Sequence, residues 1–222
     1  MPQIKQCLRL SALTLGAMMT ASALVACSQL ATPGLVRPNY DTETRALRAG
    51  EYSLDAPHST LLFKVTHLGL STYVGRFNTF SASLDFDPAS ISASRLEGSV
   101  VLSSIDVNDP AMTKRLVKKQ WLHTDAYPEA LFRSTSVDID SDGDKPQLTF
   151  NGELSFRGVT QPVSLTGEFH GGADNLLTGK YTLGFSASGT FKRSDFGMKQ
   201  YLGLVSDQVT IEIYAEFQRT NS

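Results

Sequence analysis

The sequence predicts an all-β, antiparallel domain after Gly50, and two observations support this prediction. First, apolar residues recur at every second position through most of this region, which is typical of strands with one buried face. Second, helices do not alternate with these runs, as they would between the strands of a parallel sheet. The clearest run is 209–217, whose apolar positions are Val209, Ile211, Ile213, Ala215 and Phe217.

This alternation predicts about eight strands. We expect them at 61–65, 73–86, 95–105, 132–139, 148–156, 163–169, 181–191 and 209–217. Residues 157–161 are expected to form the turn of a hairpin. Long antiparallel strands with one apolar face form either a two-sheet sandwich or a closed barrel, and closure removes exposed edges. The alternation alone is compatible with both, and glycines within the strands permit the bends of a tightly curved sheet. They are Gly98, Gly152, Gly167, Gly184 and Gly189.

One short helix, at about 109–122, is expected to interrupt the strands. Asp109 followed by Pro110 is a typical helix start, with a capping carboxylate and a proline at the first helical position. The apolar side of this helix would face the body of the domain and the basic side would face outward. That basic side is either a solvated surface or a contact for anionic lipid headgroups, and its residues are Lys114, Arg115, Lys118 and Lys119.

The first 26 residues are predicted to be a secretory signal. Lys5 and Arg9 precede an acid-free, mostly apolar stretch that is too rich in Ser, Thr and Gly for a confident membrane span. The stretch ends in Leu-Val-Ala before Cys27, which resembles a bacterial lipobox, so we expect cleavage before Cys27 and lipidation of this cysteine. Residues 27–50 would then form a flexible tether with a reach of about 25–30 Å.

Composition excludes several classes of function. Loss of the signal would remove Lys5, Arg9 and no acid, so the net charge of −2 would become more negative. A mildly acidic chain without a basic tract is a poor candidate for binding nucleic acid. The four histidines show no metal-ligand spacing, and the only two cysteines are Cys7 and Cys27, so neither a metal site nor a cofactor is predicted. No catalytic motif appears, and the chain is not predicted to be an enzyme.

Six short blocks spread over residues 52–217 closely resemble the YceI-like family. In chain order they are Asp55-x-x-His58-Ser59; Phe63-x-Val65-x-His67-x-Gly69 with Gly75-x-Phe77; Leu116 with Trp121-Leu122 and Tyr127-Pro128; Gly152-x-Leu154; Arg157-Gly158-Val159-Thr160-x-Pro162-Val163; and Arg193-Ser194-Asp195-Phe196-Gly197. The resemblance implies a single lipocalin-like β-barrel of about eight strands at 51–219. It also implies that the barrel binds a polyisoprenoid lipid in the bacterial envelope.

The resemblance also implies which residues would meet a ligand. If the barrel is hollow, its aromatic side chains would line the cavity; the candidates are Phe63, Phe77, Phe86, Trp121, Phe132, Phe150, Phe156, Phe185 and Phe191. His58, His67 and Arg193 are candidates for headgroup contacts. The alternative for the two histidines is a set of turn hydrogen bonds, and for Arg193 it is a packed turn with an Arg193–Asp195 pair.

The predicted function is therefore the binding or carriage of an isoprenoid lipid, such as a quinone or its precursor. The lipid anchor at Cys27 would hold the protein in the cell envelope, facing the periplasm. Ser28 in place of Asp resembles the sorting pattern of enteric-type bacteria that implies delivery to the outer membrane. Two alternatives stay open at this point. One is a filled barrel with a structural or stress-response role, because many eight-stranded barrels are filled by side chains. The other is a lipid-directed hydrolase or isomerase, which would need a polar group with a perturbed pKa in the cavity.

Overall fold

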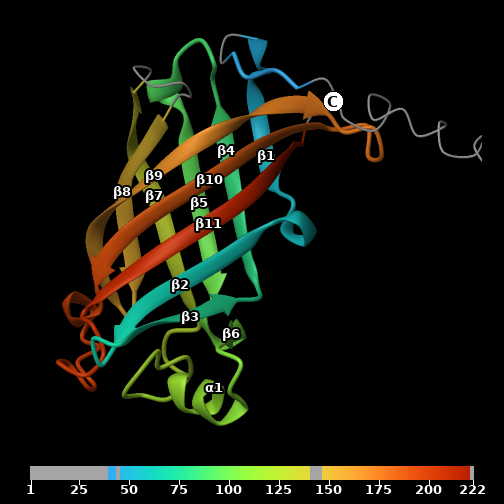
Figure 1. Ribbon diagram of the computed structural model, residues 1–222. Helices are drawn as coiled ribbons and strands as arrows, with labels where there is room; N and C mark the ends of the chain where they lie inside the picture. The colour runs from blue at the N-terminus through green and yellow to red at the C-terminus, as the bar shows by residue number, and fades with distance from the viewer. Residues whose placement is uncertain (1–39, 44–45, 141–146, 221–222) are drawn as a thin grey trace, which may run out of the picture. The chain divides into compact units, whose positions relative to one another are not determined.

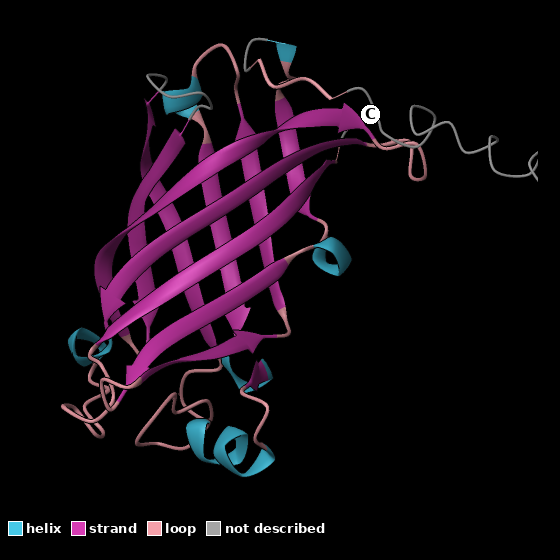
Figure 2. Cartoon of the chain, viewed as in Figure 1, coloured by secondary structure: helices cyan, strands magenta, loops and turns pink. Residues whose placement is uncertain are grey.

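A closed antiparallel barrel forms the body of the protein. The computed structural model describes residues 40–43, 46–140 and 147–220, all of which belong to the unit Pro38–Ser222. The predicted signal and Cys27 lie outside the described residues. The strands of the barrel follow one another around the ring in the order β1 (Gly50–Leu54), β4 (Phe80–Phe86), β5 (Arg95–Val101), β7 (Glu129–Asp140), β8 (Gln147–Phe156), β9 (Val159–Asp174), β10 (Tyr181–Lys192) and β11 (Gln208–Arg219). Pairing of β11 with β1 closes the ring, which confirms the predicted barrel (Figures 1 and 2).

A three-stranded extension leaves the ring next to β11. It consists of β2 (Thr60–His67), β3 (Ser71–Phe77) and β6 (Ile105–Asp106). β11 pairs with β1 through residues 217–219 and with β2 through residues 210–214. The chain therefore passes from the ring into the extension between β1 and β2, where the short 3-10 helix η2 (Ala56–His58) interrupts the wall.

The faces of β11 are those predicted from the alternation. Val209, Ala215 and Phe217 are buried, and Ile211 and Ile213 face the interior of the barrel beside them. On the outer face, the Glu212 carboxylate accepts a hydrogen bond of 2.7 Å from Lys64 Nζ on β2. The inward and outward positions thus follow from the period of two in a pleated strand.

The β8–β9 hairpin has a tighter turn than predicted. Phe156 pairs directly with Val159, so the turn consists of Arg157 and Gly158 alone rather than of residues 157–161. Both turn residues have positive φ, 54° and 75°, as the twist of a two-residue hairpin requires. A Cβ on Gly158 would also lie 2.7 Å from the Tyr127 ring, which leaves glycine as the residue that fits.

Three predicted elements are shorter than the sequence indicated. The stretch 73–86 is divided by a turn at Asn78–Thr79, and 95–105 is divided by η4 (Leu102–Ser104). The helix α1 (Pro110–Leu116) starts where expected, with the Asp109 carboxylate accepting hydrogen bonds from two backbone N–H groups. It ends at Leu116 instead of about 122, because the following turns bury Trp121 and Leu122 against the barrel end. The remaining 3-10 helices are η3 (Ile91–Ala93) and η5 (Arg193–Phe196).

Two separate hydrophobic clusters pack inside the barrel, toward its two ends. One lies toward the end of the barrel that carries the β9–β10 turn and is centred on Tyr52, Phe86, Phe169 and Leu183. The other lies toward the end where α1 and η5 cover the strands and is centred on Leu102, Trp121, Phe156 and Phe196. The space between these clusters is the candidate site.

Candidate functional site

A cavity of about 190 Å³ lies inside the barrel. Its lining comes from every strand of the ring and from β2 and β3, and it is almost entirely aliphatic and aromatic. For comparison, an apolar cavity of about 150 Å³ lined by Leu, Ile and Phe stays dry and binds benzene. The barrel is therefore hollow enough to accept a compact hydrocarbon group, and it is not the solid core of the filled-barrel alternative.

Six of the nine aromatic residues proposed for the cavity lie in its lining: Phe77, Phe132, Phe150, Phe156, Phe185 and Phe191. The other three candidates lie outside the lining. Phe86 is 2% exposed within the cluster at the β9–β10 end. Phe63 and Trp121 belong to the other cluster, at the end of the barrel that α1 and η5 cover. For Phe63 and Phe86, the position along the barrel depends on strand register and stagger, which alternation does not specify. Trp121 lies in the turns after α1 and on no strand.

Small residues on the inward faces create the space for the cavity. Ala82, Gly98, Gly167, Ala187 and Gly189 all contribute to the lining. A Cβ on Gly98 would meet only the Ser81 carbonyl oxygen, at 3.8 Å, so this glycine faces open space. A Cβ on Gly189 would lie 2.6 Å from the Ser164 carbonyl oxygen, so this glycine permits close packing of the wall. The sequence could have indicated this cavity, since each of these small residues occupies a position of its strand where a large apolar side chain would be expected.

Among the described residues, the cavity lining contains no titratable side chain, and its polar residues are Ser81, Ser99 and Ser186. The hydroxyl of Ser99 bonds to Glu129 at 3.0 Å, and that of Ser186 to His170 Nε2 at 3.0 Å. Both hydroxyls are therefore already paired with charged or titratable groups outside the lining. Such a lining suits the burial of apolar surface and offers no general acid, general base or metal ligand.

The wall around the cavity has a gap in its strand pairing. β4 pairs with β5 as far as Phe80, whereas its pairing with β1 stops at Ser83. Beyond that point the chain of β1 turns away into η2. The cavity lining includes Leu54 and Leu61, the residues on either side of this interruption, together with Phe80 and Ser81 of the facing edge. We call this part of the wall the side gap; within the described part of the chain it is where the cavity reaches an unpaired strand edge.

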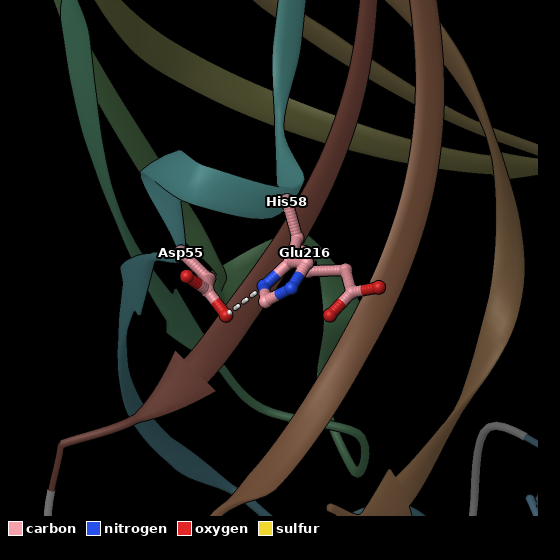
Figure 3. A group of neighbouring side chains, drawn as sticks. All are labelled: Asp55, His58 and Glu216. Atoms are coloured by element: carbon pink, nitrogen blue, oxygen red, sulfur yellow. Dashed lines mark hydrogen bonds and ion pairs between the residues drawn. The ribbon is translucent and has the colours of Figure 1, made fainter. Parts of the chain in front are cut away.

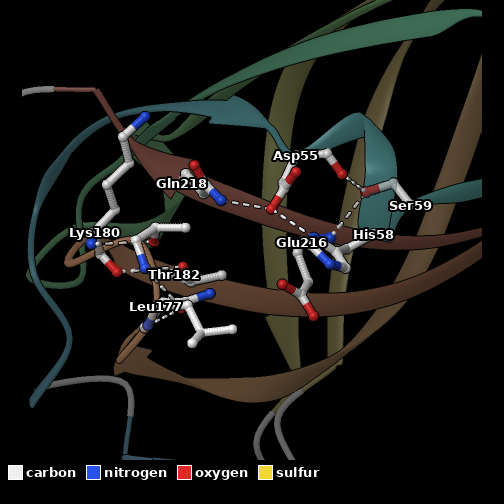
Figure 4. Close-up of polar contacts among 10 residues, drawn as sticks. Asp55, His58, Ser59, Leu177, Lys180, Thr182, Glu216 and Gln218 are labelled. Carbon is white, nitrogen blue, oxygen red and sulfur yellow. Dashed lines mark hydrogen bonds and ion pairs between the residues drawn. The ribbon is translucent and has the colours of Figure 1, made fainter.

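A polar network fixes η2 to the outer face of β11. Asp55 donates its backbone N–H to the Glu216 carbonyl at 2.8 Å, and the Ser59 hydroxyl donates to the Asp55 carbonyl at 2.8 Å. One carboxylate oxygen of Asp55 contacts His58 Nδ1 at 2.9 Å and also accepts from Gln218 Nε2 (Figures 3 and 4). His58 therefore stabilises the turn, as one of the two sequence hypotheses proposed, and its ring lies on the outer surface beside the side gap.

Electrostatics favour the charged form of His58. The hydrogen bond that the His58 ring donates to the Asp55 carboxylate, and then the charge of Asp55, raise the pKa of His58 above its ordinary value. Asp55, His58 and Glu216 each offer an atom that could ligate a metal, and these atoms lie within 4.8 Å of one another. However, the Asp55 oxygen already holds His58 and Gln218, so a metal ion would have to displace both contacts. We therefore assign this cluster to the architecture of η2.

The other two candidates for headgroup contacts lie elsewhere. His67 is exposed at the end of β2, where its backbone bridges to Val205. Arg193 is 2% exposed, and its guanidinium donates to four carbonyl oxygens, those of Met198, Gln200, Val205 and Ser206, at 2.8–3.1 Å. Desolvation lowers the pKa of Arg193, with a smaller opposing effect from the charge of Asp207. Arg193 thus organises the loop before β11, and carbonyl groups rather than the expected Asp195 are its partners.

The chain belongs to the YceI-like family, whose sequence profile matches residues 52–217. Among curated relatives, UPF0312 proteins of Shewanella baltica are 35% identical over 173 residues, which is 77% of this chain and 88% of theirs. A UPF0312 protein of Shewanella oneidensis is 36% identical over the same length and the same shares. The sequence resemblance noted above is therefore confirmed.

Solved structures share the barrel. BcnA of Burkholderia cenocepacia superimposes with a TM-score of 0.64 at 22% identity, over 73% of this chain and 98% of its own. The YCEI protein of Campylobacter jejuni has a TM-score of 0.59 at 27% identity, over 70% and 90%. A polyisoprenoid binding domain from Saccharophagus degradans has a TM-score of 0.57 at 15% identity, over 78% and 99%. At such low identity, the first and third of these likenesses show the fold alone.

Proposed function

We propose that this protein binds an isoprenoid lipid by its hydrocarbon tail in the central cavity. The observation that carries the proposal is the cavity itself, an interior space of about 190 Å³ whose lining, as far as the described residues form it, is apolar and free of titratable side chains. Membership in the YceI-like family and the fold shared with a domain described as polyisoprenoid binding support the same ligand class. The lining favours binding over catalysis, since an enzyme acting on the tail would need a polar group there.

The size of the cavity limits how much of the lipid it can hold. By comparison with the benzene-sized cavity, it has room for about one or two isoprene units. A longer tail would require the aromatic side chains of the two clusters to move apart, or part of the tail to remain outside. Each buried CH₂ contributes about 0.8 kcal/mol relative to water, but such lipids reside in membranes. The barrel therefore has to compete with the bilayer, which favours exchange of lipid over permanent storage.

The headgroup would lie at the side gap, where the cavity reaches an unpaired edge. His58 is next to this gap, but the Asp55 carboxylate at 2.9 Å balances its positive charge, and the Glu216 carboxylate lies within 4.8 Å. A neutral headgroup such as a quinone therefore suits this edge better than a diphosphate. A quinone should accordingly bind more tightly than an isoprenyl diphosphate with the same tail, as measured by competition against a fluorescent isoprenoid.

The cellular location is part of the same proposal. We infer that residues 1–26 direct export and that Cys27 carries a lipid anchor in the cell envelope, on the periplasmic side of the outer membrane. The native protein should then partition into detergent, and Cys27→Ser should release it or leave it unprocessed. Recovery of all wild-type protein in the soluble fraction with a free thiol would contradict the anchor without affecting the cavity.

Lipid extraction from the purified protein tests the central proposal. The wild type should yield an isoprenoid by mass spectrometry. Ala187→Trp and Gly98→Leu each place a side chain in the cavity, and both should abolish the bound lipid while leaving the melting temperature nearly unchanged. Ala187 lies between Phe185 and Gly189 in the lining, and Gly98 faces open space. An empty wild type, together with a large fall in melting temperature of Ala187→Trp, would instead indicate a filled core that is overpacked.

A further inference from the structure

One end of the protein carries a cluster of exposed apolar side chains that the barrel does not use. They lie on the β2–β3 turn and on the loop between η5 and β11, and we call them the tip patch: Leu68, Leu70, Tyr201, Leu202 and Leu204. Their exposed fractions run from 42% for Leu202 to 85% for Leu70. The two segments lie side by side, since the Leu68 N–H donates to the Leu204 carbonyl at 2.6 Å and His67 bridges to Val205.

The backbone at the tip patch is unfavourable for the residues it holds. Leu68 and Tyr201 both have positive φ, 53° and 54°. Glycine and asparagine adopt this conformation readily, whereas a bulky side chain rarely does. Burial does not compensate, because the two side chains are about half exposed. Folding alone therefore gives no reason for leucine at position 68, and a contact outside the chain would give one.

A basic segment adjoins the tip patch. Residues 110–124 contain four basic residues and no acid, although the whole chain has a net charge of −2. All four are exposed, and we call them the basic turn: Lys114, Arg115, Lys118 and Lys119. The nearest acids in sequence are Asp109, which caps α1, and the exposed Asp125. The Trp121 ring, three residues after Lys118, lies 5.9 Å from the ring of Tyr201 and so joins the basic turn to the tip patch.

We propose that the tip patch and the basic turn together form a docking surface for an anionic lipid bilayer. Both lie beyond the strand ends, at the same end of the barrel (Figure 1). Exposed leucines beside an aromatic residue enter the boundary between headgroups and acyl chains, while neighbouring lysines and arginines contact anionic headgroups. This surface is separate from the cavity and from any anchor at Cys27, so the proposal does not depend on the proposed ligand.

The single tryptophan of the chain provides a direct test. The full chain is mixed with vesicles of phosphatidylcholine and phosphatidylglycerol whose acyl chains are brominated near the headgroup, since bromine quenches nearby indole fluorescence. Docking by the proposed end should quench Trp121, and the quenching should weaken in vesicles of phosphatidylcholine alone and at high salt. Attachment through the N-terminal segment or the opposite end would leave Trp121 unquenched, because the tilted strands of the barrel separate the two ends by about 30 Å.

Two double variants separate the apolar and the basic contributions. Leu68→Asn with Leu70→Gln should weaken binding to both kinds of vesicle about tenfold or more. Asparagine suits the positive φ at position 68. Lys118→Gln with Lys119→Gln should weaken binding to anionic vesicles by about ten- to thirtyfold and leave binding to neutral vesicles unchanged.

A matched control lies at the other end of the barrel. Leu176 and Leu177, in the β9–β10 turn, are 70% and 96% exposed, and changing both to Gln should not alter the quenching. All these side chains are exposed, so melting temperatures should stay close to that of the wild type. Equal fluorescence in brominated and unbrominated vesicles would overturn the proposal, as would equal quenching in all three double variants. Retained quenching in Gly98→Leu would show that docking does not require the cavity.

Discussion

At the scale of single residues, Arg193 is a charged side chain that stabilises a loop instead of binding a ligand. Its guanidinium is buried and satisfies four carbonyl oxygens that would otherwise lack partners in the loop before β11. Arginine suits this position because its planar group presents several donors in fixed directions. The neighbouring Ser194 also connects η5 to the segment before β11, since its hydroxyl and backbone N–H both donate to the Asp207 carboxylate.

Replacing Arg193 should therefore destabilise the fold. We expect Arg193→Met to lower the free energy of unfolding by about 2–4 kcal/mol, because four carbonyls lose their donor. Urea denaturation measures this change. Lys192→Met is the matched control next door, on an exposed side chain, and should change the free energy by less than about 0.5 kcal/mol. Equal effects of the two substitutions would contradict the structural role of Arg193.

The pKa of His58 is a second prediction at this scale. A histidine whose pKa rises on folding contributes stability below its unfolded pKa, and loses this contribution as pH rises through the folded value. The contribution of His58 should therefore be complete below about pH 6.5 and vanish above the raised folded pKa. NMR titration of the ring should give a value above 6.5 in the wild type. In Asp55→Asn the pKa should fall, and in Glu216→Gln it should fall less, because Glu216 makes the smallest contribution.

At the scale of elements, β11 organises the barrel. It closes the ring against β1, holds the extension through β2, and pairs with β10 along nearly its whole length. Its inward side chains line the cavity while its outward ones form the Lys64–Glu212 pair and the network around Asp55. The period of two along this strand thus separates the apolar interior from the polar surface that fixes η2.

Substitutions on the two faces of β11 should have unequal costs. Ile213→Asp would bury an unpaired charge in the apolar lining, and we expect it to cost several kcal/mol of stability. Glu212→Gln would weaken a partly exposed ion pair and should cost less than about 1 kcal/mol. Chemical denaturation of both variants checks the assignment. A Glu212→Gln variant as unstable as Ile213→Asp would show that the ion pair, and not the face, determines the cost.

At the scale of the whole molecule, the barrel combines a packed shell with an open centre. The two hydrophobic clusters stabilise its ends, and small residues in the middle leave the cavity between them. Among the described residues, no helix is long and apolar enough to cross a bilayer. The proposed routes to a membrane are accordingly the tip patch with the basic turn and, outside the described residues, an anchor at Cys27.

Removal of a bound lipid should affect the stability of the whole molecule. A ligand that binds only the folded state stabilises it, by about 2.7 kcal/mol at one hundred times its dissociation constant. Delipidated wild-type protein should therefore melt at a lower temperature than protein purified with its lipid. Gly98→Leu, whose cavity is filled by its own side chain, should melt at the same temperature before and after delipidation. Calorimetry on the four samples makes this comparison, and an equal shift in both proteins would place the lipid outside the cavity.

The sequence by itself determined the all-β class, the inward face of β11 and the start of α1, because these depend on local periodicity and capping. It also carried the family resemblance that selected the barrel over the sandwich. Only the tertiary structure decided where Phe63 and Phe86 lie along the barrel, since register and stagger arise from pairing between distant strands. The cavity, the side gap and the meeting of Leu68 with Leu204 are likewise tertiary. Each depends on residues far apart in the chain, whose contacts no local pattern encodes.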